Sequence, residues 1–345
     1  MKLLFSFLLI ISFFRCQSAI AGNLEVVVVG GGPAGLATAI EAHTQGASVT
    51  VIEKRELRSR FQTLFLFDSS LDLLEKWLVL PTEMKAIKLP DNTKVGLVSI
   101  NNLEMAFEKR IQELGIKKIT GEFIGFQGED TKAIQIEREG KVFTLPYDIL
   151  VGADGAHSLV RNKIDVQSNR MGEVQAINAM ISLPESLGAF DISDPISIKG
   201  FFIRKITIPS KSIIFAQRIP ATSNAQKSVS EQTLEELARD CNWLLEAKML
   251  EENRADIANF TVLLQQAVTF SHQQKGTILV GDAAAVASFF QGMSANTALK
   301  TASIAGEFFM KLQQQNVDAY SFFNQEMNIA TDELIQDSKF LFCSN

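Results

Sequence analysis

Cysteine and histidine are scarce in this sequence of 345 residues, which contains three of each. It has no CxxC pair and no His/Cys cluster with metal-ligand spacing, so we expect no metal site. The scarcity of histidine and the lack of a GxSxG motif argue against a Ser/His/Asp hydrolase. Cys241 and Cys343 leave open a single disulfide in the chain beyond residue 21, which is too little for a disulfide framework.

A strong charge of one sign is also missing. The chain has 33 Lys and Arg against 39 Asp and Glu, a net charge of -6, and no basic stripe. Nucleic acid is therefore not an expected partner. With 46% hydrophobic residues, no low-complexity tract and no fixed-period repeat, the composition is that of a globular protein with one large domain or two closely packed ones.

The chain begins with an apolar run that is too short to span a bilayer. Residues 3–14 are apolar, follow Lys2 and precede small residues at Ala19 and Ala21. A spanning helix needs about 20 apolar residues, so we expect no stable membrane span. The pattern predicts a signal peptide over residues 1–21 and an exported protein, periplasmic or secreted. An uncleaved anchor in the membrane interface is the alternative.

Three glycines follow the first buried strand at a telling spacing. Residues 24–29 are apolar except for Glu25 and end in four β-branched valines, as in a buried parallel strand. The next residues are Gly30-Gly31-Gly32-Pro33-Ala34-Gly35, which contain GxGxxG. We expect a helix over residues 33–45, since proline is well tolerated in a first helical turn, and a second buried strand over residues 47–52. Together these elements predict a βαβ unit.

Each glycine of this motif has a physical reason. Gly30 permits the tight turn, Gly32 lets the backbone approach a pyrophosphate, and Gly35 lets helix and strand pack closely. The helix N-terminus offers N–H groups to the anion. Glu53 ends the second strand, where a carboxylate takes ribose hydroxyls. The pattern predicts a dinucleotide cradle, and a glycine-rich packing turn without a ligand is the alternative.

Two further strand ends carry acids. The segment YDILVGADGAHSLVR places Asp154 after a buried strand, and GTILVGDAAAV places Asp282 after another, read as strand, turn and helix. Ahead of the first of these two segments, apolar residues at helical spacing predict a helix over residues 99–114. Residues 116–127 and 132–139 alternate like antiparallel strands, as do residues 166–226 between the two segments. We therefore predict an α/β fold, with a Rossmann-like parallel-sheet domain over residues 22–165 and 266–345. An antiparallel-sheet substrate domain is inserted over residues 166–265.

These three motifs, in this order, resemble those of the FAD-dependent aromatic hydroxylases of the p-hydroxybenzoate hydroxylase fold group. The resemblance implies FAD as cofactor and NAD(P)H as co-substrate. It implies that Asp282 holds the ribityl chain, that the helix after it points its N-terminus at the flavin, and that Asp154 lies where FAD and NAD(P)H meet. His157, in the same motif, is expected to face solvent or NAD(P)H, because the flavin carries the chemistry.

The stretch after Glu53 is similar to the flavin monooxygenase domain of MICAL proteins. That resemblance implies contacts from Arg55 and Arg60 to FAD, and guanidinium groups do pair well with phosphates. Lys54, between Glu53 and Arg55, is a further candidate for cofactor binding. Solvated loop charges are the alternative for both arginines. The actin-related partner domains of MICAL are absent, so its substrate is not carried over.

The third motif also departs from the family. The chain reads Gly292-Met293-Ser294-Ala295-Asn296 where a second glycine is usual at Ser294. We expect Gly292, Ser294 and Asn296 still to border FAD, because a serine is small. Phe289 and Phe290 are candidates for a substrate pocket over the flavin, with burial in the core as the alternative.

The resemblance implies an NAD(P)H-driven monooxygenase. It implies that oxygen would add at flavin C4a and that the resulting hydroperoxide would transfer oxygen to a small organic substrate in a dry pocket. Two alternatives stay open on the same residues. One is an FAD-dependent reductase or oxidase, as among the geranylgeranyl reductases. The other is a flavin-binding interaction protein that has lost turnover.

Overall fold

The computed structural model describes most of the chain beyond its first residues. The described ranges are 23–56, 62–88, 94–128, 131–184, 191–208, 210–219, 231–288 and 292–339. The predicted signal peptide, Arg60, Phe289 and Phe290 lie outside these ranges. The predictions made for them therefore stay predictions.

A six-stranded sheet forms the centre of the molecule, in the order β17-β18-β10-β1-β2-β6. All neighbouring pairs are parallel except β17 with β18. Its strands are β1 (Glu25–Val29), β2 (Ser48–Glu53), β6 (Lys117–Thr120), β10 (Ile149–Gly152), β17 (Ser271–His272) and β18 (Thr277–Leu279). Strands β1 and β10 are buried almost throughout, as expected of parallel strands covered on both faces.

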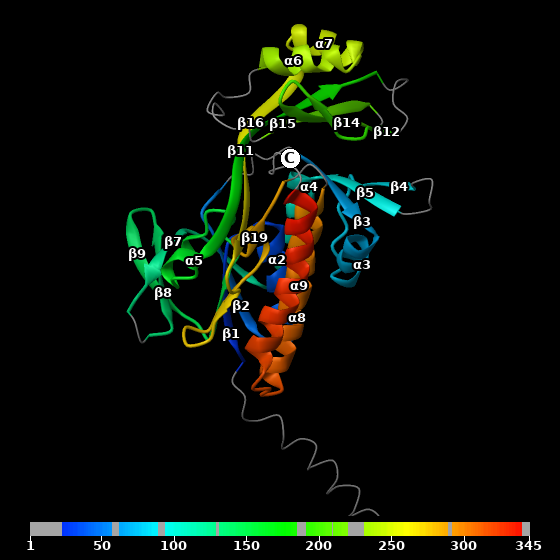
Figure 1. Cartoon of the computed structure of the whole chain (residues 1–345). Helices are drawn as coiled ribbons and strands as arrows, with labels where there is room; N and C mark the ends of the chain where they lie inside the picture. Colours follow the sequence, from blue (N-terminus) through cyan, green and yellow to red (C-terminus); the bar gives the residue numbers. More distant parts are fainter. Residues whose placement is uncertain are drawn as a thin grey trace, which may run out of the picture.

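Helices cover this sheet. Helix α2 packs against α8 and α4, and the long helices α8 and α9 run side by side (Figure 1). Their bounds are α2 (Pro33–Thr44), α3 (Asp68–Lys76), α4 (Ile100–Glu113), α5 (Leu159–Lys163), α8 (Met293–Gln313) and α9 (Ala319–Lys339). In the part of the chain that is described, no helix is long and apolar enough to cross a membrane.

A seven-stranded sheet lies at the top of the view in Figure 1, under α6 (Glu231–Asp240) and α7 (Leu244–Glu251). All its pairs are antiparallel. Its strands are β11 (Ser168–Ser182), β12 (Asp191–Ile192), β13 (Ile196–Ile198), β14 (Phe201–Ile208), β15 (Lys211–Arg218), β16 (Ala255–Ala267) and β19 (Ala285–Val286). The long strands β11 and β16 run down from this sheet toward the parallel one (Figure 1).

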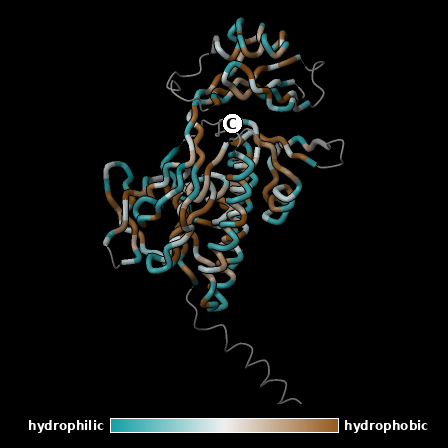
Figure 2. Tube along the Cα trace, viewed as in Figure 1, coloured by the Kyte–Doolittle hydropathy of each residue, from teal (hydrophilic) through white to brown (hydrophobic). Residues whose placement is uncertain are grey.

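The two faces of the antiparallel sheet belong to different hydrophobic clusters. Ile177 and Ile214 pack on one side with residues of α6 and α7. Ala176 and Phe215 pack on the other side, with Phe65 of β3, residues of β5 and β19, and the end of α9. Hydrophobic residues (brown) and hydrophilic residues (teal) are interspersed along both the strands and the helices (Figure 2). This second face joins the antiparallel sheet to the rest of the molecule.

Two three-stranded sheets complete the fold. They are β3-β5-β4 (Thr63–Phe67, Lys94–Ser99, Lys85–Lys88) and β7-β8-β9 (Glu122–Phe126, Ala133–Arg138, Lys141–Pro146). The sequence predicted alternating antiparallel strands from residue 116 onward. The start of that segment instead forms β6, which pairs in parallel with β2, so this part of the prediction was wrong. Alternation of polar and apolar residues does not reveal the partner of an edge strand.

The predicted strand, turn and helix after residue 276 needs a correction. Strand β18 leads into a short 3-10 turn, Gly281–Ala283, and then into strand β19. No helix follows directly, because the backbone of Gln265 and Gln266 in β16 pairs with Val286 and Ala285 of β19. Helix α8 begins only at Met293. The predicted α/β class with a parallel and an antiparallel sheet is confirmed, and the domain boundaries stay predictions.

Candidate FAD-binding site

The turn from β1 to α2 is shaped by its glycines. Gly30 has a φ of 113°, and a Cβ there would overlap the carbonyl oxygen of Ala153. A Cβ on Gly35 would overlap the carbonyl oxygen of Gly30. Gly32 is the N-cap of α2 and offers no side-chain cap. The first N–H groups of α2 are therefore left for an anion, which is the arrangement predicted for a pyrophosphate.

Glu53, at the end of β2, is tied to this turn. Its Oε2 accepts a hydrogen bond from the Gly31 N–H at 2.7 Å, and its Oε1 accepts from the Arg55 backbone N–H and Nε at 2.9 and 3.0 Å. Burial raises the pKa of Glu53, but these hydrogen bonds outweigh it and leave the pKa below its usual value. Glu53 is thus a carboxylate, and its Oε2, which accepts one hydrogen bond, keeps lone-pair capacity for a ribose hydroxyl.

Gly31 was not assigned a role from the sequence. Its N–H donates to Glu53, and a Cβ there would lie 3.0 Å from the Cβ of Glu53. Sequence reasoning passed over it because GxGxxG leaves this position free. The run of three glycines, Gly30-Gly31-Gly32, is the feature of the sequence that could have identified it.

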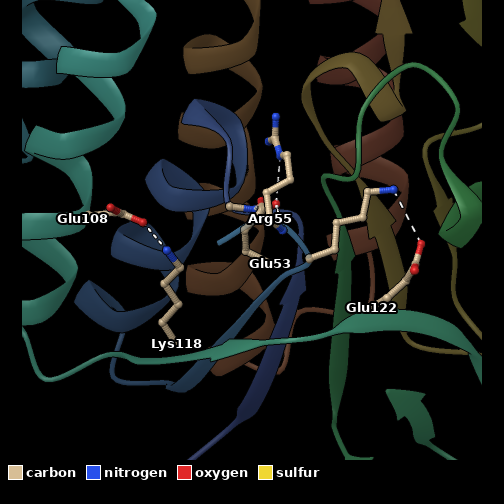
Figure 3. Close-up of polar contacts among 7 residues, drawn as sticks. Glu53, Arg55, Glu108, Lys118 and Glu122 are labelled. Atoms are coloured by element: carbon tan, nitrogen blue, oxygen red, sulfur yellow. Dashed lines mark hydrogen bonds and ion pairs between the residues drawn. The ribbon is translucent and has the colours of Figure 1, made fainter. Parts of the chain in front are cut away.

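The charged residues after Glu53 are exposed at one side of the site (Figure 3). Arg55 turns back onto Glu53, and Lys54 Nζ lies 3.5 Å from Glu122 Oε1 on β7. Glu108 and Lys118 form another ion pair nearby, between α4 and β6 (Figure 3). Lys54 and Arg55 are therefore positioned beside the predicted ribose site, with acidic partners from this chain.

The carboxylate of Asp154, from the second motif, holds the start of helix α5. Its carboxylate accepts hydrogen bonds from Ser158 Oγ at 2.5 Å and from the N–H groups of Leu159 and Val160 at 2.7 and 3.1 Å. It thus satisfies the N-terminus of α5. Asp154 still lines the cavity, but its side chain is engaged in holding this helix.

Arg161 connects the second motif with the third, and sequence reasoning did not assign it to the site. It is buried and donates to the Ala283 carbonyl at 2.8 Å and to the Ala156 carbonyl at 3.0 Å. Burial lowers its pKa, and the charge of Asp154 opposes that effect. Gln265 of β16 also donates to the Ala156 carbonyl, at 2.6 Å. These bonds hold the loop before α5, the 3-10 turn and the antiparallel sheet together.

The third motif brings the 3-10 turn against α2. Gly281 has a φ of 57°, and a Cβ there would come within 2.6 Å of the Cβ of Ala34. The Gly281 N–H donates to Thr301 Oγ1 of α8 at 3.0 Å. Asp282 follows on the exposed side of the turn and lines the cavity, as a residue that takes a ligand hydroxyl must.

The N-terminus of α8 is at the same cavity. Gly292 is its N-cap, with a φ of 72° and no side-chain cap, and Ser294 and Ala295 line the cavity. Asn296, predicted to border FAD, instead fastens β3. Its amide donates to the carbonyls of Phe65 and Gly292 at 2.7 and 2.8 Å. Its Oδ1 accepts from the Phe67 N–H and from Ser70 Oγ at 2.9 and 2.6 Å.

These pieces enclose one cavity of about 510 Å³, within the range of small-molecule and cofactor sites. Gly35, Gly292 and Asn296 do not line it, because their atoms serve packing and capping. The predicted residues that line it are Gly30, Gly32, Pro33, Ala34, Glu53, Lys54, Arg55, Asp154, Asp282 and Ser294.

FAD fits this arrangement. The glycine turn and α2 provide the backbone donors that a pyrophosphate needs, in a space that a Cβ on Gly30 would disrupt. Glu53 offers a carboxylate at one end, and Asp282 with the α8 N-terminus offers an acid and a positive dipole end at the other. The fold and the cavity together define a dinucleotide-binding protein of the flavin type.

Comparison with known proteins agrees with this class. Residues 93–318 match the FAD_binding_3 family, described as an FAD binding domain, and residues 25–74 match FAD_binding_2, also an FAD binding domain. The first match covers more than half of the chain, and the chain belongs to this family of FAD binding domains.

One curated relative is the uncharacterized aromatic compound monooxygenase YhjG of Bacillus subtilis (strain 168). It is 28% identical over 166 residues, which are 41% of this chain and 33% of that protein. The match thus spans about a third of the length of the relative.

Solved structures share the fold. The Diels-Alderase PyrE3 of pyrroindomycin biosynthesis has a TM-score of 0.73 and 17% identity, with 92% of this chain and 72% of that chain covered. Aklavinone-11 hydroxylase, solved with FAD and aklavinone, has a TM-score of 0.71 and 17% identity, covering 93% and 69%. The 2-methyl-3-hydroxypyridine-5-carboxylic acid oxygenase has a TM-score of 0.67 and 18% identity, covering 93% and 91%. The predicted aromatic-hydroxylase fold group is confirmed; the MICAL resemblance stays a prediction.

Proposed function

We propose that this protein is an FAD-dependent monooxygenase that uses NAD(P)H and molecular oxygen to place one oxygen atom in a small organic substrate. The observation that carries the proposal is the single cavity on which all three motifs converge. The presence of hydroxylases and oxygenases among proteins of the same fold, and an aromatic compound monooxygenase among its relatives, supports it.

Different residues of this chain bind different parts of FAD. The glycine turn and the α2 N-terminus hold the pyrophosphate, Glu53 holds the ribose, and Asp282 holds the ribityl chain. The α8 N-terminus, beside Ser294, provides a positive dipole end for the ring. When bound, FAD supplies the exchange of electrons with NAD(P)H and oxygen. The protein supplies orientation and excludes water.

The first experiment is an absorbance spectrum of the purified protein, followed by NADPH or NADH in air. We expect the visible bands of oxidised flavin, their bleaching by the reduced nucleotide and their return with oxygen. Isotopically labelled O₂ with a panel of phenols should give a product that carries one labelled oxygen atom. This last result separates a monooxygenase from the alternatives.

Other outcomes of these experiments would support the alternative functions. Nucleotide oxidation that yields only hydrogen peroxide, with no labelled product from any substrate, would contradict the proposal and assign an oxidase or a reductase. Bound flavin that neither NADPH nor NADH bleaches would also contradict it. That result would favour an interaction protein, or a non-redox reaction such as the one named for PyrE3 on the same fold.

A further inference from the structure

Asn178 presents a buried acceptor without a donor. The residue is 2% exposed, in the middle of β11, and its Oδ1 has no hydrogen-bond partner in the described structure. Leaving a buried amide oxygen unpaired costs about 1–3 kcal/mol. Such an atom in the interior of a sheet needs an explanation, and a ligand that donates to it is one.

The strand registers place Asn178 on the face that looks toward the rest of the molecule. Its neighbours Ile177 and Ala179 pack in the cluster under α6 and α7. Ala176, two residues away, packs in the cluster that includes Phe65, Val95 and Leu97 of β3 and β5. Because side chains alternate along a strand, Asn178 shares the face of Ala176.

Pairing then gives the neighbours of Asn178 across the sheet. Asn178 lies opposite Phe215 of β15 and Ala258 of β16, and the next row on this face contains Gln217, Ala176 and Phe260. Phe202 of β14 is opposite Gln217. Phe202, Phe260 and Met180 are only partly buried where they pack on this cluster. Phe and Met side chains thus surround Asn178, and such side chains pack well against a flat apolar ring.

A buried hydrogen bond joins this face to the segment that follows β19. Gln217 is 0% exposed, and its Oε1 accepts from Ser288 Oγ at 2.8 Å. Ser288 follows β19 and comes shortly before α8, where Ser294 lines the cavity and donates to the Ala287 carbonyl at 3.4 Å. Because Ser288 already occupies the oxygen of Gln217, the unpaired acceptor on these rows is that of Asn178.

We propose that Asn178 determines substrate specificity: its Oδ1 accepts a hydrogen bond from a hydroxyl or N–H group on an aromatic substrate held against this sheet face. This inference rests on the proposed monooxygenase function and names the substrate class. The substrate is a ring compound with a donor, such as a phenol or an N-heterocycle. An ether of the same ring lacks the donor and leaves the amide oxygen unpaired.

A matched pair of probes tests this directly. 1-Naphthol and 1-methoxynaphthalene share the ring and differ in the donor. Each is titrated into the FAD-loaded protein, and binding is followed by the change in the flavin absorbance spectrum without NAD(P)H. We expect 1-naphthol to bind at least about fivefold tighter, since one hydrogen bond to a buried group is worth about 1–3 kcal/mol.

Asn178→Leu is the decisive variant and Asn259→Leu its control. Asn259 lies opposite Ile177 on the other face of the sheet and is exposed, so the same chemical change there should keep the preference. Asn178→Leu should abolish it, and Asn178→Ala serves if leucine disturbs folding. Without ligand, Asn178→Leu should raise the Tm by about 1–3 °C, because an unpaired acceptor is removed.

Several outcomes would overturn the proposal. They are an unchanged preference in Asn178→Leu, equal binding of both probes to the native protein, no binding of either probe, or a lower Tm for Asn178→Leu with the preference kept. FAD content and oxidation of NADPH are measured separately on the same preparations. Failure of this inference is therefore distinguishable from failure of the proposed function, which would appear in those two measurements.

Discussion

The parallel sheet and the antiparallel sheet use their residues in different ways. At the carboxyl ends of β1, β2 and β18 the backbone forms the binding surface, and the requirement falls on glycines such as Gly30 and Gly281. In the antiparallel sheet the backbone is regular, and the difference between its two faces is made by side chains such as Ile177 and Asn178. Sequence motifs are therefore easy to recognise where the backbone requires glycine. They are harder to recognise where side chains determine the structure of a region.

The largest effect is expected for Gly30→Ala. The new Cβ would overlap the Ala153 carbonyl, and the φ of 113° is unfavourable for any side chain. We expect a loss of at least about 4 kcal/mol in the free energy of unfolding and no retained FAD. Urea unfolding and the flavin absorbance of the purified variant measure both.

Gly140→Ala is the control for that variant. Gly140 also has a positive φ, 72°, but a Cβ there meets nothing within 4 Å. It should cost about 1 kcal/mol and leave FAD binding unchanged. Equal effects of the two substitutions would show that strain alone, and no close backbone approach, explains Gly30.

Ile177→Ala should separate stability from cofactor binding. Ile177 is fully buried in the cluster under α6 and α7. Its truncation should lower the free energy of unfolding by about 2–5 kcal/mol. The FAD dissociation constant, measured by flavin fluorescence under native conditions, should stay within twofold, about 0.4 kcal/mol. A large loss of FAD affinity would mean that the two regions are more tightly coupled than their clusters suggest.

Asp282→Ala should lower the affinity for FAD and leave the stability of the protein nearly unchanged. Asp282 is exposed on the cavity side of its turn, so the free energy of unfolding without FAD should change by less than about 0.5 kcal/mol. The affinity for FAD should fall by about 1–3 kcal/mol, which corresponds to roughly fivefold to 150-fold. Equilibrium dialysis of both proteins gives the constants. An unchanged constant would remove Asp282 from the site.

Glu53→Gln should reveal a pH-dependent contribution from the parallel-sheet region. Burial raises the pKa of Glu53, yet the hydrogen bonds from Arg55 and Gly31 bring it below 4.5. A lowered pKa means that its contribution is fully present above pH 4.5 and is lost as the pH falls through the folded-state pKa. The stability difference from the native protein, from urea unfolding at several pH values, should therefore shrink in acid. A constant difference would contradict this.

The smallest effect is expected for Lys54→Met. The ion pair of Lys54 with Glu122 spans 3.5 Å between side chains that are 64% and 58% exposed. Water and salt screen such a pair, so the free energy of unfolding should change by less than about 0.5 kcal/mol. A loss of FAD affinity with unchanged stability would instead assign Lys54 a direct contact to the cofactor.

Much of the fold could be predicted because its signals are local. The helix expected over residues 99–114 is α4, Ile100–Glu113, since its apolar residues recur at helical spacing. The βαβ unit at the start follows from a buried run, a glycine turn and a proline at the first helical position. The strand expected after residue 276 is there, but the helix assigned to its turn is not.

Parts of the site could not be predicted because their partners are distant. Asn296 bonds to Phe65, 231 positions away, and Arg161 bonds to Ala283, 122 positions away. The family resemblance places Asp154 where FAD and NAD(P)H meet, and it does not reveal that the start of α5 also bonds to its carboxylate. A polar residue near a motif shows that a hydrogen-bonding group is available. It does not show which atom will be the hydrogen-bond partner of that group.

The amino-acid sequence by itself determined that this chain forms a glycine turn for a dinucleotide, an acid at the end of the next strand and a parallel sheet. These depend on backbone sterics and hydrophobic periodicity within short segments. Only the tertiary structure decided which acids line the cavity, which carboxylates hold helix ends, and which residues lie on each face of the antiparallel sheet. Those outcomes depend on the register of strands far apart in the chain, because register assigns every side chain to one face or the other.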